Sequence, residues 1–364
     1  MYPVMNSASK VNGIAFGVLL AGMFVYSLPP VFSFARNQTD AWNLFVDGKL
    51  LRKFEQVYEK RFFLREPSVE LWANAQYRLF DEGTKGVVLG KDGWLYTNQE
   101  YRVPNDLQAN LDGQLKQIAE IGQQLKAHNK RLILLPLPMK ADVYAAHAER
   151  AIDPRAISLY DRFVERLQAQ NIAVTPLRSA FLANLAGPGL FLKSDTHWSP
   201  EGARLSAYEL ARQHPELLGD ERYLSHKVAD KTVKGDLMNY IQFNHVQLAP
   251  QFGPSQIALY ETLKAEQNAG DLFASENQSL MLVGTSYSKI DDWNFVGFLK
   301  EALNRDLLSV SVEARGPFEA MSQFLASDQL SNPEIDTVVW EFPLRTLLAH
   351  RLGSLSRPGQ TQHF

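Results

Sequence analysis

Cysteine is absent from this chain of 364 residues. A disulfide framework, a zinc ribbon and a thiol nucleophile are therefore all excluded. The sequence also lacks a surplus of positive charge, because 37 Lys and Arg residues face 40 Asp and Glu residues. Nucleic acid is not expected as the main partner, since neutralising phosphates requires an excess of basic residues. A hydrophobic share of 45% is ample for a packed core and argues against intrinsic disorder or collagen-like repeats.

One long segment near the amino terminus carries no charge. Residues 11–35 form a run of 25 uncharged residues. As a helix this run would measure roughly 37 Å, enough to cross a hydrocarbon core of about 30 Å, although Pro29 and Pro30 are expected to end the regular helix early. We favour a retained signal anchor, with residues 1–10 cytoplasmic and the remainder a periplasmic body on a single-pass anchor in the inner membrane. The alternatives are a signal peptide cleaved after Ser33-Phe34-Ala35, which leaves a periplasmic protein, and a buried core helix.

The remainder of the chain divides into a helical region, an α/β body and a tail. In residues 36–85 aromatic side chains recur every three or four positions, which predicts a juxtamembrane region of two helices interrupted near Pro67. Residues 86–350 are predicted to form the α/β domain. The hydrophobic alternation within 220–275 is weak, which indicates an insertion or a lid. The tail 351–364 is predicted to be flexible.

Apolar strands and amphipathic helices alternate through the body. A hairpin is expected first, with strands at 87–89 and 94–96 around a turn that contains Gly90 and Gly93. Apolar runs predict five further strands, at 131–137, 172–175, 279–283, 307–312 and 337–342. Helices are predicted among them at 106–128, 154–170, 200–213 and 293–303. This alternation favours an α/β fold with a mostly parallel sheet covered on both faces.

Ser286 lies just beyond the carboxyl end of a predicted strand, in the segment Gly284-Thr285-Ser286-Tyr287-Ser288. Open α/β sheets place their functional sites at this edge. A serine in such a turn exposes its hydroxyl, and the backbone N–H groups that follow, starting with Tyr287, are candidate donors to an oxyanion. The alternative is an ordinary helix-capping turn.

A second candidate segment runs from Lys193 to Gly202 and contains Asp195 and His197. A serine nucleophile needs a base at neutral pH, and histidine has a suitable pKa. Asp195 stands two residues away and can hold the imidazole in one tautomer. The alternatives are a metal pair and a hydrogen-bonded core histidine. The other histidines show no metal-ligand spacing, so we predict no metal.

Together with three further segments, these two motifs resemble the alginate O-acetyltransferase family, the AlgJ/AlgX-type group of SGNH-hydrolase-like proteins. The further segments are Gly90–Tyr96, Pro136–Lys140 with Tyr144, and Trp340–Arg345. The resemblance implies a three-layer α/β/α catalytic domain behind an amino-terminal anchor. It also implies a triad of Ser286, His197 and Asp195. The serine follows the histidine, which matches the permuted motif order of this group.

Five further candidates concern the oxyanion and the substrate. Tyr287, Gly235 and Asn239 are candidates for the oxyanion region, with loop structure as the alternative for the last two. Lys140 and Arg345 are candidates for binding an acidic or polar saccharide, with a structural ion pair as the alternative.

The resemblance implies an enzyme that moves acetyl groups onto a secreted polysaccharide, without a cofactor. Its expected partners are an acetyl donor delivered by a multipass membrane acyltransferase, a polysaccharide acceptor, either alginate or cellulose, and other exopolysaccharide acetylation proteins. Two alternatives share the same residues. One is an acetylesterase with water as the acceptor, and the other is an anchored, non-catalytic scaffold that binds polysaccharide.

Overall fold

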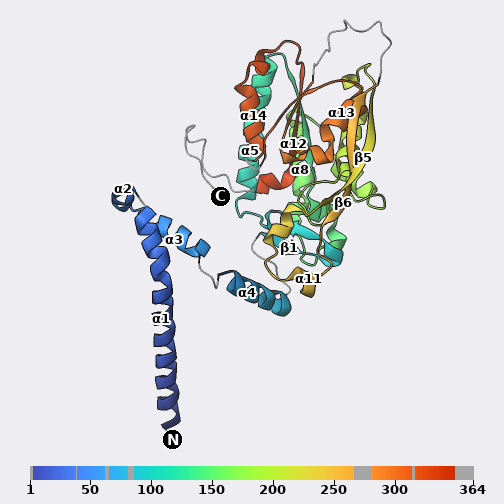
Figure 1. The fold of residues 1–364 in the computed structure, drawn as a ribbon. Helices are drawn as coiled ribbons and strands as arrows, with labels where there is room; N and C mark the ends of the chain where they lie inside the picture. Colours follow the sequence, from blue (N-terminus) through green and yellow to red (C-terminus); the bar gives the residue numbers. More distant parts are fainter. Residues whose placement is uncertain are drawn as a thin grey trace. The chain divides into compact units, whose positions relative to one another are not determined.

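The computed structural model describes residues 3–37, 39–61, 65–80, 86–265, 280–313 and 316–348 (Figure 1). Two compact units divide the chain between Ala75 and Gln76. The predicted tail 351–364 lies outside the described residues, so its flexibility stays a prediction.

The first unit is helical. It contains α1 (Pro3–Asn37), α2 (Ala41–Val46) and α3 (Leu50–Arg61), and α4 (Arg65–Phe80) begins in it. Two predictions were wrong here. The helix α1 continues through Pro29 and Pro30, although a proline inside a helix removes a backbone hydrogen bond. The region after it holds three helices rather than two, and Pro67 lies in the first turn of α4, where its missing N–H costs no hydrogen bond.

Residues Lys10–Asn37 of α1 are long and apolar enough to cross a membrane, as judged by length and composition alone. Large side chains such as Phe16, Val18 and Phe24 are exposed along this helix, which argues against a core helix. The helix is compatible with the predicted anchor, and a signal sequence would meet the same criterion.

The second unit is built on a five-stranded sheet in the order β4-β3-β9-β7-β8, with every neighbouring pair parallel. The strands are β3 (Arg131–Leu137), β4 (Ala173–Val174), β7 (Leu280–Gly284), β8 (Leu308–Ser311) and β9 (Thr337–Pro343). The central strands β3, β9 and β7 are almost wholly buried, which explains their continuous apolar sequences. The predicted parallel sheet is confirmed.

Helices cover both faces of this sheet. The longer ones are α5 (Leu107–Ala127), α8 (Leu159–Ala169), α10 (Pro200–Gln213), α13 (Phe295–Leu303) and α14 (Pro317–Leu325). The shorter ones are α6 (Lys140–Val143), α7 (Pro154–Ile157), α9 (Arg178–Ala183), α11 (His245–Leu248) and α12 (Ser286–Lys289). Figure 1 shows α5 and α14 on one flank of the sheet and α13 on the other. The structure adds α14 to the predicted helices and divides the predicted helix 154–170 into α7 and α8.

Two antiparallel hairpins flank the sheet. The first pairs β1 (Val87–Leu89) with β2 (Leu95–Thr97) and confirms the predicted hairpin. The second pairs β5 (Tyr223–Val233) with β6 (Ser255–Lys264) and occupies the region that the sequence indicated as an insertion or lid. Both strands of this ribbon pack against α13. Most side chains of β5 are exposed, and this exposure explains the weak alternation in its sequence.

Candidate active site

The three residues of the predicted triad come from two segments at one edge of the sheet. Ser286 is the first residue of α12, separated from the end of β7 by Thr285, and it is half-buried. Asp195 and His197 lie in a tight loop closed by a β-bridge between Phe191 and Trp198. The loop leads into α10, whose N-cap Ser199 accepts a hydrogen bond from Gly202 N at 3.2 Å. The capped start of α10 therefore fixes the end of the segment that carries the histidine.

A continuous hydrogen-bonded relay joins the three side chains. His197 Nε2 lies 2.8 Å from Ser286 Oγ, and His197 Nδ1 lies 2.6 Å from Asp195 Oδ1. The carboxylate favours the proton on Nδ1, because it can only accept. Nε2 is then left to accept the proton of the serine hydroxyl, which is the arrangement that a general base requires.

Asp195 is held by two backbone N–H groups as well as by the imidazole. The N–H of His197 donates to its Oδ1 at 2.9 Å and the N–H of Asp236 donates to its Oδ2 at 2.8 Å. Burial on its own would raise the pKa of Asp195, but the hydrogen bonds and charge of His197 outweigh it and hold that pKa below the usual range. The carboxylate therefore stays ionised beside the histidine.

Asp236 is a site residue that the sequence analysis missed. Its carboxylate accepts hydrogen bonds from Thr196 N at 2.8 Å and Thr196 Oγ1 at 2.6 Å, which ties the loop between Asp195 and His197 to the segment after β5. Burial, followed by the negative charge of Asp195, raises the pKa of Asp236. The only available signal was its place in Lys234-Gly235-Asp236, beside a glycine that had been singled out.

Asp195, His197 and Asp236 also bring ligand atoms within 4.8 Å of one another, as a metal site would. Their hydrogen bonds do not fit this role. Both oxygens of each carboxylate accept bonds from the protein, and His197 spans Asp195 and Ser286. A metal ion would have to displace these bonds, so the group is better described as a hydrogen-bonded relay.

Glu341 on β9 supports the turn that carries Ser286 and was also missed. It is fully buried and accepts hydrogen bonds from Thr285 N at 2.8 Å, Thr285 Oγ1 at 2.9 Å and Ser288 Oγ at 2.7 Å. Its burial raises the pKa of this carboxyl. A Cβ at Gly284 would lie 2.3 Å from Ser288 Oγ, so this turn requires glycine. The signal in the sequence was an acidic residue inside the apolar strand Thr337–Phe342.

The side chain of Tyr287 supports the histidine rather than facing a substrate. It is 1% exposed, and its ring lies 4.7 Å from the His197 ring between centroids. Its hydroxyl donates to the Thr196 carbonyl. Its backbone N–H, the predicted oxyanion donor, lies 3.4 Å from Thr285 Oγ1, a long hydrogen bond. Trp293, which the sequence analysis did not single out, stacks on the His197 ring, with 5.8 Å between the ring centroids.

Lys140 does not reach a substrate, and the structure corrects the saccharide-binding prediction for it. The residue is 2% exposed, and its ammonium donates to the carbonyls of Leu95 and Leu192 at 2.6 Å and of Lys193 and Asp195 at 2.9 Å. Burial lowers the pKa of Lys140 to about 7, and the nearby Glu100 acts in the opposite direction. Lys140 therefore has a structural role, as the alternative proposed, but its ammonium is held by backbone carbonyls rather than by a direct ion pair.

The other three candidates also have structural contacts. Arg345 is half-buried and donates to the hydroxyl of Tyr287, with its guanidinium carbon 5.3 Å from that ring. Saccharide binding by Arg345 stays a prediction. Gly235 has φ of +81°, and a Cβ there would lie 2.2 Å from the Ser194 carbonyl oxygen. Asn239 is exposed and accepts a hydrogen bond from Lys234 Nζ at 3.1 Å. The contacts described for Gly235 and Asn239 are with Ser194 and Lys234 rather than with Ser286, and loop structure accounts for both.

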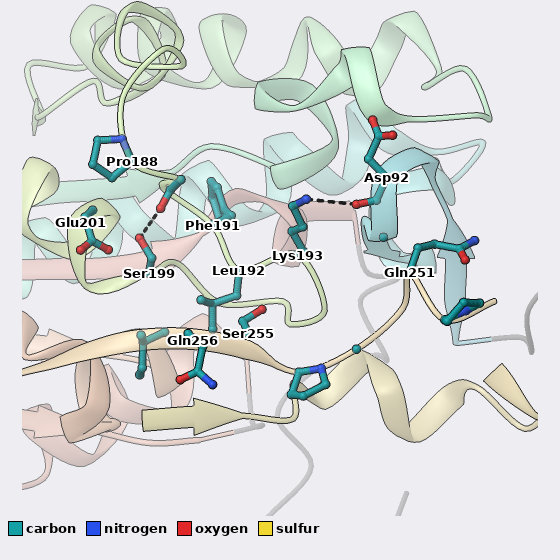
Figure 2. Close-up of a pocket in the computed structure, with 16 residues that line it drawn as sticks. Asp92, Pro188, Phe191, Leu192, Lys193, Ser199, Glu201, Gln251, Ser255 and Gln256 are labelled. Carbon is teal, nitrogen blue, oxygen red and sulfur yellow. Dashed lines mark hydrogen bonds between the residues drawn. The ribbon is translucent and has the colours of Figure 1, made fainter. Parts of the chain in front are cut away.

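A groove of about 610 Å³ lies beside this loop (Figure 2). Its walls come from Asp92 and Gly93 of the first hairpin, from the stretch Pro188–Lys193, and from the stretch Pro250–Ile257. Ser199 and Glu201 at the start of α10 complete it. None of Asp195, His197 and Ser286 lines the groove, so it is separate from the hydroxyl of the serine.

Comparison with known proteins identifies the family to which this domain belongs. A family model described as "SGNH hydrolase-like domain, acetyltransferase AlgX" matches residues 87–344. A probable alginate O-acetylase AlgJ from Pseudomonas fluorescens is 34% identical over 342 residues, which is 91% of this chain and 85% of that protein.

Solved structures show the same fold. The O-acetyltransferase domain of Pseudomonas putida AlgJ is 28% identical, with a TM-score of 0.67 over 74% of this chain and 94% of that one. Pseudomonas aeruginosa AlgX shares the fold at 20% identity, with a TM-score of 0.57 over 72% of this chain and 66% of that one. The predicted AlgJ/AlgX-type resemblance and SGNH-like fold are thereby confirmed. The chain belongs to the SGNH hydrolase-like acetyltransferase family of AlgX, and it is an acyltransferase.

Proposed function

We propose that this protein transfers acetyl groups to hydroxyls of an exported polysaccharide, through an acetyl-serine on Ser286. The observation that carries the proposal is the relay in which His197 contacts both Ser286 Oγ and Asp195. A serine that served stability alone would not need its hydroxyl beside a base that is itself hydrogen-bonded to a buried carboxylate. The relay also counts against a scaffold with a misaligned triad.

In the first half-reaction, Ser286 Oγ attacks the carbonyl carbon of the acetyl donor while its proton passes to His197 Nε2. Negative charge develops on the carbonyl oxygen, and the backbone N–H of Tyr287, whose bond to Thr285 Oγ1 is long, is the candidate donor to it. The tetrahedral intermediate then collapses. The bond to the donor's leaving group breaks, and the leaving group takes the proton from His197, so that acetyl-serine remains.

In the second half-reaction, a sugar hydroxyl attacks the acetyl-serine. His197 Nε2 removes the hydroxyl proton and returns it to Ser286 Oγ when the acyl bond to serine breaks. The product is an O-acetyl sugar and free enzyme. Asp195 holds the imidazole in position and stabilises its positive charge in both halves.

Alginate is the acceptor that the relatives support, because several are named alginate O-acetylases. Cellulose is the alternative acceptor. The helix Lys10–Asn37 supports a periplasmic site for the reaction, with the anchor in the inner membrane. On this proposal the acetyl donor comes from a multipass membrane acyltransferase, and AlgX-type relatives suggest other alginate-modification proteins as partners.

Replacing the nucleophile tests the proposal. We expect Ser286→Ala to reduce acetyl transfer to an oligosaccharide at least about a thousandfold, and to abolish an acetyl adduct on the peptide containing residue 286. Ser322→Ala, at an exposed position on α14, is the matched control and should retain activity. Undiminished transfer by Ser286→Ala would contradict the mechanism. Acetate release in place of sugar acetylation by the unaltered protein would identify an esterase instead.

A further inference from the structure

The groove beside the triad loop has a volume typical of a ligand site. Its volume of about 610 Å³ is within the range of roughly 300–1,000 Å³ that is usual for small-molecule sites. Figure 2 shows its labelled residues spread along a line, with Glu201 at one end and Asp92 and Gln251 at the other. Phe191 and Lys193 lie along one side, and Ser255 and Gln256 lie opposite them. An elongated ligand fits this outline better than a compact one.

The groove and the triad share one loop. Leu192 and Lys193 line the groove, and Asp195 and His197 follow within four residues. Leu192 N donates to the His197 carbonyl at 3.2 Å. The segment that lines the groove and the segment that carries the base therefore lie side by side in the same loop. The groove thus adjoins the loop that presents the base to Ser286.

The lining combines polar side chains with flat apolar surfaces. Lys193, Gln251 and Gln256 are exposed polar residues, and Glu201 is half-buried. Amide, carboxylate and ammonium groups are the donors and acceptors that pair with sugar hydroxyls. Pro188 is exposed and offers apolar surface of the kind that packs on the C–H faces of pyranose rings, whereas Phe191 is 3% exposed and belongs to the core.

Among the described residues that line this groove, Lys193 is the only one with a cationic side chain. Its ammonium donates to the Asp92 carbonyl at 3.1 Å and lies 6.0 Å from the centre of the Trp94 ring, which orients it at the Asp92 end. Lys140 is buried and directed into the fold, and Arg345 does not line the groove. A bound carboxylate would therefore meet Lys193.

We propose that this groove, defined by Pro188, Lys193, Glu201, Gln251 and Gln256, binds a segment of a pyranose chain. The inference rests on the proposed function, since the bound chain would be the acceptor of the acetyl group. The shared chemistry is a row of rings with free hydroxyls, which a uronate polymer and a neutral glucan both present. A uronate gains a charge-assisted hydrogen bond from Lys193, whereas a neutral glucan relies on the amides.

Direct binding tests this site without requiring turnover. The full-length protein in detergent is titrated with hexamannuronate and separately with cellohexaose, and the dissociation constants are measured by calorimetry. The variants are Lys193→Gln and Gln251→Ala, both at exposed positions where folding should be unaffected. Lys126→Gln, which removes an exposed charge at the end of α5 away from the groove lining, is the matched control.

We expect at least one hexamer to bind, and both groove variants to weaken it about three- to tenfold while Lys126→Gln does not. If hexamannuronate is the ligand, its binding also weakens with added salt and Lys193→Gln has the larger effect. If cellohexaose is the ligand, salt has little effect and Gln251→Ala has the larger effect. No saturable binding of either hexamer, or equal binding by the groove variants, would overturn the proposal.

The failure of this inference is distinguishable from failure of the proposed function. Ser286→Ala should bind the hexamer like the unaltered protein, because Ser286 does not line the groove. Loss of transfer in Ser286→Ala together with no hexamer binding would refute the groove alone. Groove-dependent binding together with full transfer by Ser286→Ala would refute the acetyl-serine alone.

Discussion

The ammonium of Lys140 donates to the backbone carbonyl of Asp195 at 2.9 Å. The same Nζ also donates to the carbonyls of Leu192 and Lys193, so one buried cation holds the loop that presents the acid of the relay. Four carbonyls compete for three ammonium hydrogens, and at least one of these bonds is shared. The contact between Lys140, which follows β3, and Asp195, 55 residues later, thus helps to set the geometry of the site.

Removing this cation should destabilise the fold. We expect Lys140→Met to lower the free energy of unfolding by about 3 kcal/mol, because buried carbonyls would lose their donor. Activity should fall as well, since the loop bearing Asp195 loses its support. Urea denaturation provides the measurement, with Lys126→Met at an exposed position as a control expected within about 0.5 kcal/mol of the unaltered protein. Equal stability of Lys140→Met and the unaltered protein would show that the carbonyls find other donors.

The two carboxylates beside His197 should differ sharply in importance. Asp195→Asn should reduce acetyl transfer by about a thousandfold or more, because an amide can favour the wrong imidazole tautomer. Asp236→Asn should reduce it less than about tenfold. Its backbone N–H still donates to residue 195, and an amide oxygen still accepts from Thr196. Steady-state rates with a small acetyl ester give the comparison. Equal losses in the two variants would assign Asp236 a larger role than positioning.

Glu341 should make the stability depend on pH in a defined direction. Burial raises its pKa above the ordinary value of 4.5, so the folded protein holds the proton more tightly than the unfolded chain. The resulting stabilisation is complete below the unfolded pKa and is lost as the pH rises through the folded pKa. Relative to Glu341→Gln, the unaltered protein should therefore be more stable at about pH 5 than at about pH 8. Denaturation of both proteins at the two pH values is the measurement, and a difference that grows with pH would contradict the assignment.

Gly235 should resist substitution for a backbone reason. Its φ of +81° and the 2.2 Å approach of a Cβ to the Ser194 carbonyl oxygen leave no space for a side chain. Gly235→Ala should lower the free energy of unfolding by about 2–3 kcal/mol and move Asp236 away from Thr196. Gly122→Ala is the control, because a Cβ there meets its nearest atom at 3.7 Å within α5, where alanine favours the helix. Thermal unfolding of the two variants tests the contrast. Little loss of stability in Gly235→Ala would mean that the segment after β5 relaxes easily.

The sequence was sufficient for features that depend on neighbouring residues. Continuous apolar runs identify β3, β7 and β9, because a strand buried on both faces needs no polar side. The glycines around Lys91 and Asp92 predict the first hairpin, and Ser199-Pro200 predicts the start of α10. Even the pairing of Asp195 with His197 follows from a separation of two residues. The joining of His197 to Ser286, 89 residues away, came from motif order and family resemblance rather than from spacing.

Tertiary structure alone decided what the isolated charged residues do. Lys140 and Arg345 look in the sequence like cations available to a saccharide, yet one is surrounded by carbonyls and the other lies against Tyr287. Asp236 and Glu341 became part of the site only when chain segments 41 and 56 residues apart met. A periodic pattern reports which face of a strand or helix is buried, because that depends on local geometry. It does not report which distant backbone group a buried charge will meet, and that contact determines whether the charge is left for a ligand.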